Sequence, residues 1–144
     1  MQISKNILPI PKDAYYSARY QYNSSIIISS ISKYTSKSGV DKVLGITDFD
    51  LYVPPLNFVF GEAQYQGKVA IVSLHRLKPE FYGQPPDRKL FGDRAIKEAI
   101  HEIGHTLGLS HCQNPHCVMF FSLHIGMTDR KGKKFCEKCY RKVG

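Results

Sequence analysis

The sequence predicts an α/β (α+β) fold, and two patterns of apolar residues support this prediction. Short stretches of alternating apolar residues indicate strands, and apolar residues at helical spacing before a glycine indicate a helix. All four cysteines follow residue 111. We therefore expect one domain over residues 1–144, with the sheet and the main helix in residues 1–111 and a cysteine-containing segment in residues 112–144.

The beginning of the chain predicts a short strand and then a helix. Residues 4–11 are interpreted as a strand that two prolines end. We expect Asp13 to cap a helix that runs to about Ser36. Its apolar residues recur near one face, namely Ala18, Tyr22, Ile27, Ile31 and Tyr34. The β-branched run at residues 26–28 would suit a strand equally well.

Strands and a loop are predicted next. Residues 42–53 indicate a strand, because apolar residues alternate near its end: Phe49, Leu51 and Val53. Residues 58–64 and 68–76 indicate two more strands, which a turn at Gln66 and Gly67 would join as a hairpin. A glycine and two prolines make residues 78–87 a loop.

The next predicted element is a long helix. Asp93 is expected to cap it, and the apolar residues of its buried face are Ala95, Ile96, Ala99, Ile100, Ile103 and Leu107. Gly108 can adopt the left-handed conformation that reverses the chain after a helix. The helix is therefore expected to end just before this glycine.

This helix carries a motif that predicts a catalytic zinc site, His-Glu-Ile-Gly-His-Thr-Leu-Gly-Leu-Ser-His at residues 101–111. His101 and His105 lie one helical turn apart, so that both imidazoles can bind one ion. The chain reversal brings His111 back as a third ligand. Glu102 is then expected to act as the catalytic general base, taking a proton from a metal-bound water rather than binding the metal.

The four cysteines predict a second metal site. Cys112 and Cys117 are separated by four residues, and Cys136 and Cys139 form a C-x-x-C pair. This spacing suits a tetrahedral structural zinc, so that we expect two zinc ions per chain. Four cysteines fill such a site, so that His116 is expected to stay exposed. Two disulfides are the alternative if the chain is secreted.

The long zinc motif followed by Met119 is typical of the metzincin clan. Its direct fusion to a four-cysteine site resembles the archaemetzincins. Further similar stretches lie upstream, at residues 41–48, 50–54, 56–63 and 79–83. The resemblance extends from about residue 9 to residue 144.

The resemblance implies a compact zincin/metzincin-like domain with a small, mixed, twisted sheet, and it favours the helix after Asp13. It also implies that Met119 lies beneath the three histidines. A substrate peptide would lie antiparallel to an edge strand, for which residues 57–64 are the candidate. Family members usually begin with a further strand and helix, so that the chain looks shortened at its N-terminus. Phe121 stands where some metzincins have a tyrosine that approaches the metal.

The function that follows is that of a zinc metallopeptidase acting on peptides or proteins. Two alternatives stay open. One is a regulatory protein that keeps zinc but cleaves little, although pure metal binding would not need Glu102. The other is a zinc-ribbon protein that binds nucleic acid, which salt-sensitive retention of nucleic acid would support.

Charge and composition bear on the partners. The net charge is +8, and the basic residues after residue 128 make up much of it: Arg130, Lys131, Lys133, Lys134, Lys138, Arg141 and Lys142. They would suit nucleic acid, but they would also offset the double negative charge of a zinc ion bound by four thiolates, which we favour. No apolar run spans a bilayer and no signal peptide is recognisable. We expect a cytoplasmic monomer without membrane or nucleic-acid partners.

Overall fold

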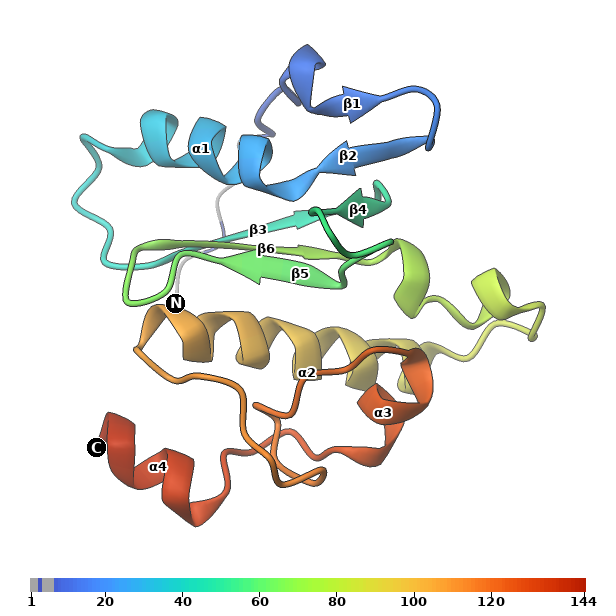
Figure 1. Ribbon diagram of the computed structural model, residues 1–144, viewed down its shortest axis with the longest axis vertical. Helices are drawn as coiled ribbons and strands as arrows, with labels where there is room; N and C mark the ends of the chain where they lie inside the picture. Colours follow the sequence, from blue (N-terminus) through green and yellow to red (C-terminus); the bar gives the residue numbers. More distant parts are fainter. Residues whose placement is uncertain (1–2, 4–6) are drawn as a thin grey trace.

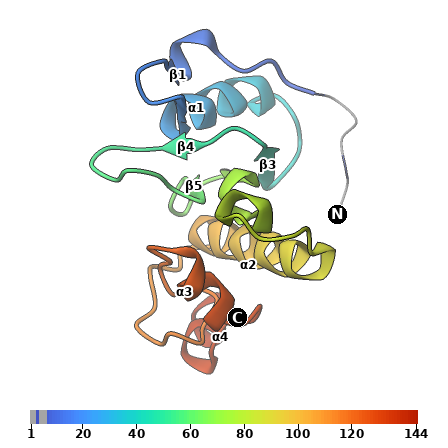
Figure 2. The same ribbon diagram turned by 90° about the vertical axis from the view of Figure 1, so that its right-hand side faces the viewer.

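The computed structural model describes residues 3 and 7–144. Helix α1 (Ser24–Thr35) lies on one face of a three-stranded sheet, and helix α2 (Arg88–Thr106) lies on the other (Figure 1). The C-terminal segment, with α3 (Ile125–Arg130) and α4 (Glu137–Val143), packs on the far side of α2 (Figure 2). The structure confirms the predicted α/β class with mixed parallel and antiparallel strand pairing.

The larger sheet has the strand order β3-β6-β5, with β3 at Val43–Thr47, β6 at Val69–Ser73 and β5 at Gly61–Ala63. Strand β3 runs parallel to β6, and β5 pairs with β6 as the predicted antiparallel hairpin. All five residues of β6 are buried, because helices cover both faces of this central strand. Strand β5 lies at the edge of this sheet.

The smaller sheet contains β1 (Tyr15–Tyr16), β2 (Gln21–Asn23) and β4 (Leu51–Tyr52), in the order β1-β2-β4. The expectation of one sheet is therefore wrong, and so is that of a continuous strand over residues 42–53. The chain turns after β3, where the Thr47 hydroxyl accepts a hydrogen bond from the backbone N–H of Phe49. It then pairs with β2 instead of continuing along β6.

The predicted helix start at Asp13 is wrong. Lys12–Ala14 forms a 3-10 turn (η1), and the β1–β2 hairpin follows it. Helix α1 begins only at Ser24, and the Asn23 side chain caps it by accepting hydrogen bonds from two backbone N–H groups. Residues 7–11 contain no strand, and residues 4–6 of that prediction lie outside the described residues. Pairing of Gln21–Asn23 with β4 overrides the helical pattern there.

Helix α2 also begins earlier than predicted. The Asp87 side chain caps it by accepting a hydrogen bond from the Leu90 N–H, whereas Asp93 lies inside the helix and pairs with Lys89 and Lys133. The predicted loop before it contains the 3-10 turn η3 (Pro79–Tyr82), which follows η2 (His75–Leu77).

The C-terminal end of α2 is fixed by the hairpin between β5 and β6. Gly108 has a φ of 96°, as the predicted chain reversal requires. The backbone N–H of Gln66 donates to the His105 carbonyl at 2.9 Å, and the Tyr65 hydroxyl donates to the Gly108 carbonyl at 2.9 Å. Lys42 Nζ donates to the Thr106 carbonyl. These donors satisfy carbonyls that the end of a helix leaves unpaired.

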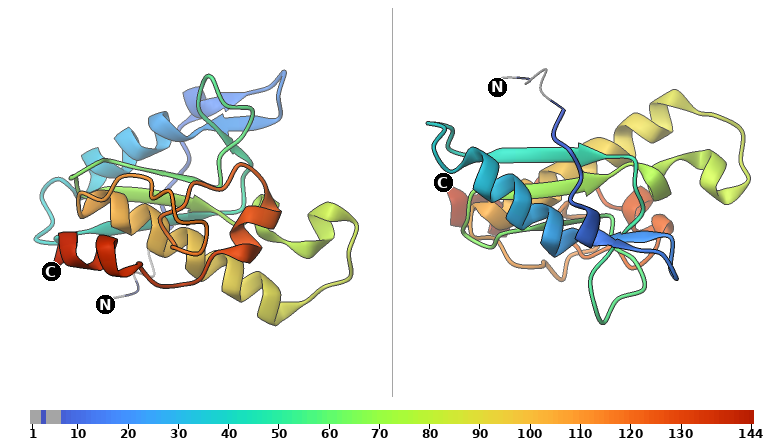
Figure 3. Two further views of the ribbon diagram at one scale, coloured as in Figure 1. Left: turned by 60° about the horizontal axis from the view of Figure 1, so that its bottom comes forward. Right: turned by 90° about the horizontal axis from the view of Figure 1, so that it is seen from above.

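Within the described residues, three apolar clusters follow the layers of the fold. The first packs α1 on the sheet, the second packs α2 on the opposite face, and the third joins α2 to the cysteine segment. Figure 3 shows α1 across the sheet from above and the C-terminal segment across α2 from below. No helix among residues 7–144 is long and apolar enough to cross a membrane.

The two possible helix caps give a direct test. Asn23→Ala should lower the free energy of unfolding by about 1 kcal/mol, because two backbone N–H groups lose their acceptor. Asp13→Ala, at an exposed position, should change it by less than about 0.5 kcal/mol. Urea unfolding of both variants measures the difference, and the reverse order would contradict the observed start of α1.

Candidate metal centres

One face of α2 carries the polar residues of the candidate catalytic site. Glu98, His101, Glu102 and His105 have the spacing i, i+3, i+4 and i+7, which brings them to the same side of a helix. His101 and Glu102 are buried, His105 is half-buried and His111 is exposed. The site is therefore closed towards the helix and open beside His111.

The three predicted histidines lie together. Each offers one ligand atom, and these atoms lie within 4.8 Å of one another. Nε2 of His101 and Nε2 of His105 are 3.2 Å apart, close to the ~3.3 Å expected for two nitrogens that share a tetrahedral zinc. The ring of His111 stacks on Phe121 at a centroid distance of 4.6 Å.

Backbone carbonyls orient two of these rings. The Val118 carbonyl lies 2.9 Å from Nδ1 of His101, and the Leu109 carbonyl lies 2.7 Å from Nδ1 of His105. A carbonyl only accepts hydrogen bonds, so that each Nδ1 must carry the proton and each Nε2 keeps its lone pair. The two Nε2 atoms therefore face the centre of the cluster ready to bind a cation.

Burial lowers the pKa of all three imidazoles. For His101 the pKa falls well below the usual value, because burial and then the charge of Lys131 disfavour the protonated ring. Burial is also the main cause for His105 and His111. The rings are therefore neutral near neutral pH, the state in which imidazole binds zinc.

Glu102 lies against strand β5. A Cβ atom built on Gly61 would come within 2.8 Å of Cγ of Glu102, so that a glycine is needed for this close approach. Burial, and then the nearby Glu98 carboxyl, raise the pKa of Glu102 well above its usual value. A raised pKa suits a carboxyl group that takes up and releases a proton near neutral pH.

The four cysteines form the second candidate centre. Sγ of Cys112 lies 3.8 Å from Sγ of Cys136, and Sγ of Cys117 lies 3.9 Å from Sγ of Cys139. Thiolates around a tetrahedral zinc at ~2.3 Å are about 3.8 Å apart, whereas a disulfide needs about 2.05 Å. A hydrogen bond from the Cys139 backbone lowers the pKa of Cys136 to about 7, whereas burial raises the pKa of Cys117 and of Cys139. The arrangement fits one ion.

A cavity opens beside the histidines. Residues 56–61 form one wall and residues 121–123 the other, and Glu98, His101 and Glu102 line it from α2. Its volume of about 170 Å³ is more than ten times the ~10–15 Å³ that one water needs. The cavity can therefore hold a side chain. The buried hydroxyl of Ser122, which has no hydrogen-bond partner among residues 7–144, lies in its wall.

The edge strand next to this cavity offers free backbone groups. In the β5–β6 pair, the Phe60 carbonyl and the Gln64 N–H bond to β6. Hydrogen bonding alternates along an antiparallel pair, so that the peptide groups of Gly61 and Ala63 face the open edge. An extended peptide could pair with them close to Glu102.

Comparison with known proteins shows the family of this chain. The model of peptidase family M54 matches residues 4–144. The chain belongs to peptidase family M54. It is accordingly a zinc metallopeptidase, as the motif predicted.

The M54 chain is similar to archaemetzincins over most of its length. It is 51% identical to archaemetzincin of Methanocaldococcus jannaschii over 140 residues, 95% of this chain and 75% of the relative. The crystal structure of archaemetzincin from Methanopyrus kandleri superposes with a TM-score of 0.84 at 41% identity, covering 93% of this chain and 70% of that one. The crystal structure of a zinc-dependent peptidase from Methanocorpusculum labreanum superposes with a TM-score of 0.89 at 35% identity. The match covers 99% of this chain and 83% of that one.

The sequence interpretation missed an ion pair beneath the M54 site. Lys131, one of the basic residues expected to offset the charge of a cysteine-bound zinc, is instead fully buried and contacts Glu98 at 3.0 Å. It also donates to the Phe120 carbonyl, and Thr128 donates to Glu98. Because Glu98 precedes His101 by three residues, its position on the same side of the helix could have been predicted. No sequence pattern predicts its contact with Lys131.

Met119 and Gly104 fit together on another side of the M54 helix. Met119 is fully buried, and a Cβ on Gly104 would clash with its thioether. Gly104 therefore allows the methionine to approach α2 next to His105. His116 is exposed, as expected, and His124 caps α3 by accepting a hydrogen bond from the Gly126 N–H.

Gly61 gives a test of the contact with Glu102. Gly61→Ala should lower the free energy of unfolding by about 1–3 kcal/mol, because its methyl group would meet the Ile71 carbonyl at 2.5 Å and Glu102 at 2.8 Å. Gly92→Ala in α2 is the matched control: nothing lies within 4 Å, so that stability should rise by about 0.5–1 kcal/mol. Equal effects in urea unfolding would contradict the close packing.

Proposed function

We propose that this M54 peptidase hydrolyses peptide bonds with Glu102 as the general base, beside a zinc ion held by His101, His105 and His111. The observation that carries this proposal is the convergence of the three imidazoles next to a buried carboxyl group at a cavity large enough for a side chain. A bound zinc ion would polarise a water and the scissile carbonyl.

The protein's own residues divide the remaining work. Glu102 accepts the proton of the attacking water and donates it to the leaving nitrogen, which lets one carboxyl group serve both halves of the reaction. Phe121 stacks on His111 and supplies no hydroxyl group to the site. The carbonyls of Val118 and Leu109 hold His101 and His105 in one tautomer throughout.

The substrate is proposed to lie along the open edge of β5. Its backbone pairs with the peptide groups of Gly61 and Ala63, and one side chain enters the cavity between residues 56–61 and 121–123. Backbone pairing holds any extended sequence, so that the cavity would supply the selectivity. Phe58 and Phe60 make one of its walls aromatic, which favours an apolar side chain.

A second zinc ion is proposed at Cys112, Cys117, Cys136 and Cys139, with a structural role. The distances between the sulfurs support it, and the backbone N–H groups of Met119 and Cys136 both donate to Cys117. Cys117 is followed directly by Val118, whose carbonyl orients His101. The second ion would therefore help to keep the Val118 carbonyl in position to orient His101.

The metal content tests both centres together. Purified protein should contain two zinc ions per chain, and a chelator should remove one readily and the other slowly, because four thiolates enclose their ion. Cys136→Ser should open the cysteine site, release Val118 and weaken zinc binding at the histidines by about 10–100-fold. Chelator titration with elemental analysis measures each step. A wild-type content of one zinc would overturn the two-site proposal.

The general base is tested by Glu102→Gln, which keeps the size of the side chain and removes its proton-accepting charge. We expect kcat to fall by at least about 10⁴-fold, since Glu102 serves both proton transfers. Zinc content and thermal unfolding should stay unchanged. The assay uses a peptide that the wild type cleaves, selected from an internally quenched library.

Two outcomes of this assay would contradict the proposal. Full activity of Glu102→Gln would remove Glu102 from the mechanism. A zinc-loaded wild type that cleaves no library peptide would favour the zinc-binding regulatory role instead.

A further inference from the structure

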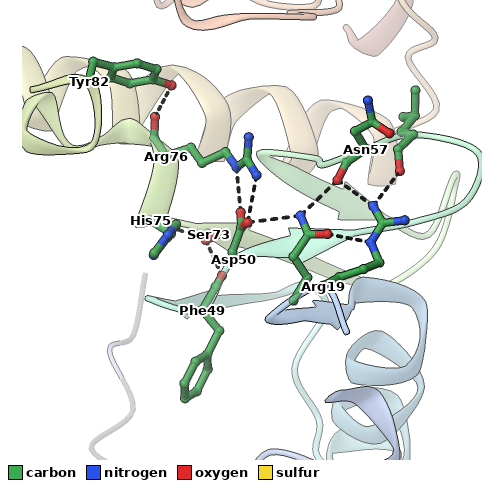
Figure 4. Close-up of polar contacts among 10 residues, drawn as sticks. Arg19, Phe49, Asp50, Asn57, Ser73, His75, Arg76 and Tyr82 are labelled. Carbon is green, nitrogen blue, oxygen red and sulfur yellow. Dashed lines mark hydrogen bonds and ion pairs between the residues drawn. The ribbon is translucent and has the colours of Figure 1, made fainter. Parts of the chain in front are cut away.

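The cavity wall formed by residues 56–60 is held partly by side chains from other segments of the fold. Its residues 56–60 lie between β4 and β5 and have little regular secondary structure. The Val59 N–H bonds to the Leu51 carbonyl, and the Phe60 carbonyl accepts from Ser73. The Asn57 carbonyl, by contrast, is bound entirely by side chains from elsewhere in the fold (Figure 4).

Two side chains of the β1–β2 region hold this carbonyl. Nη2 of Arg19 donates to the Asn57 oxygen at 2.7 Å, and Nε2 of Gln21 donates to the same oxygen at 2.9 Å. Nε of Arg19 also donates to Oε1 of Gln21 at 2.7 Å, which fixes the orientation of the Gln21 amide. Gln21 is buried, so that these bonds are shielded from water.

A charged pair fixes Gln21 from the other side. Nε2 of Gln21 donates to Oδ2 of Asp50 at 3.0 Å, and Arg76 grips both oxygens of Asp50 at 2.8 and 2.9 Å. The Asp50 side chain is only 11% exposed, so that this two-bond pair is less screened than a surface ion pair.

Arg76 also contacts the cavity wall directly. The carbon at the centre of its guanidinium group lies 4.2 Å from the centroid of the Phe58 ring, and Phe58 lines the cavity. Arg76 thus reaches residues 56–60 by two routes, through Asp50 and Gln21 to the Asn57 carbonyl and by stacking on Phe58. It is not among the residues that line the cavity near His101 and Glu102.

We propose that Arg76 and Asp50 are positioning residues, which set the cavity wall at residues 56–60 for the substrate side chain. This proposal rests on the proposed function, because it assumes that a peptide occupies the cavity. Without the pair, the wall can shift relative to α2 while the histidines and Glu102 keep their own supports. Substrate binding would then weaken, whereas the chemical step and the metal would be little affected.

The experiment compares zinc-loaded wild type with Arg76→Ala, Arg76→Lys and Asp50→Asn. Lys78→Ala is the matched control, since it removes the Lys78 to Asp48 ion pair, whose side chains are 40% and 68% exposed. Kinetics use a peptide selected from an internally quenched random library by cleavage with the wild type. Amide hydrogen exchange is followed over residues 56–60 and 101–111.

For Arg76→Ala we expect KM to rise by about 10- to 100-fold with kcat nearly unchanged. Exchange should become faster at residues 56–60 and stay unchanged at residues 101–111. Arg76→Lys keeps the positive charge but lacks the planar guanidinium group, so that we expect a smaller rise in KM and a smaller increase in exchange. This variant provides the test if Arg76→Ala does not fold. Lys78→Ala should resemble the wild type.

Unchanged KM and unchanged exchange in Arg76→Ala would overturn the proposal, as would a fall in kcat with loss of zinc. If the wild type cleaves no library peptide, the proposed function fails and the substrate part of this proposal fails with it. The exchange data still decide separately whether Arg76 and Asp50 hold residues 56–60.

Discussion

Two hydrogen bonds between backbone carbonyls and imidazoles orient the histidines of the candidate metal site. They fix which ring nitrogen of His101 and His105 faces the centre of the cluster. The two carbonyls belong to different segments of the chain. The Leu109 carbonyl depends on the chain reversal at Gly108, and the Val118 carbonyl depends on the cysteine segment. The geometry of the candidate histidine site therefore depends on the part of the fold that brings residues 109–118 back over α2.

The buried charges beneath the site serve the same purpose. Lys131 connects Glu98 on α2 with the Phe120 carbonyl, next to the residues that line the cavity. Burying an isolated charge is strongly unfavourable, so that both partners must stay together once the segment has packed. The pair therefore fixes the distance between α2 and Phe120, which directly precedes the cavity wall at residues 121–123. Arg76 and Asp50 act on the opposite wall.

Most of the candidate site could be predicted from local spacing. The seven candidate metal ligands and Glu102 lie in short sequence motifs. These are one helical turn with the chain reversal that follows it, and two pairs of closely spaced cysteines. The residues that orient and enclose them were missed, namely Val118 through its carbonyl, Gly61, Glu98 and Lys131. Their roles depend on contacts between distant segments, such as the close approach of β5 to α2. A single sequence holds no periodic signal for such contacts.

The sequence by itself determined the α/β class, the hairpin of β5 and β6, the helix that carries the histidines and its end at Gly108. Each follows from short-range physics, such as side-chain alternation or the backbone freedom of glycine. Tertiary structure alone decided that residues 12–23 form a turn and a hairpin, and that residues 43–52 divide between two sheets. These outcomes follow from the pairing of β1 and β4 with β2 and of β3 with β6. Backbone hydrogen bonds between distant segments outweigh weak local preferences.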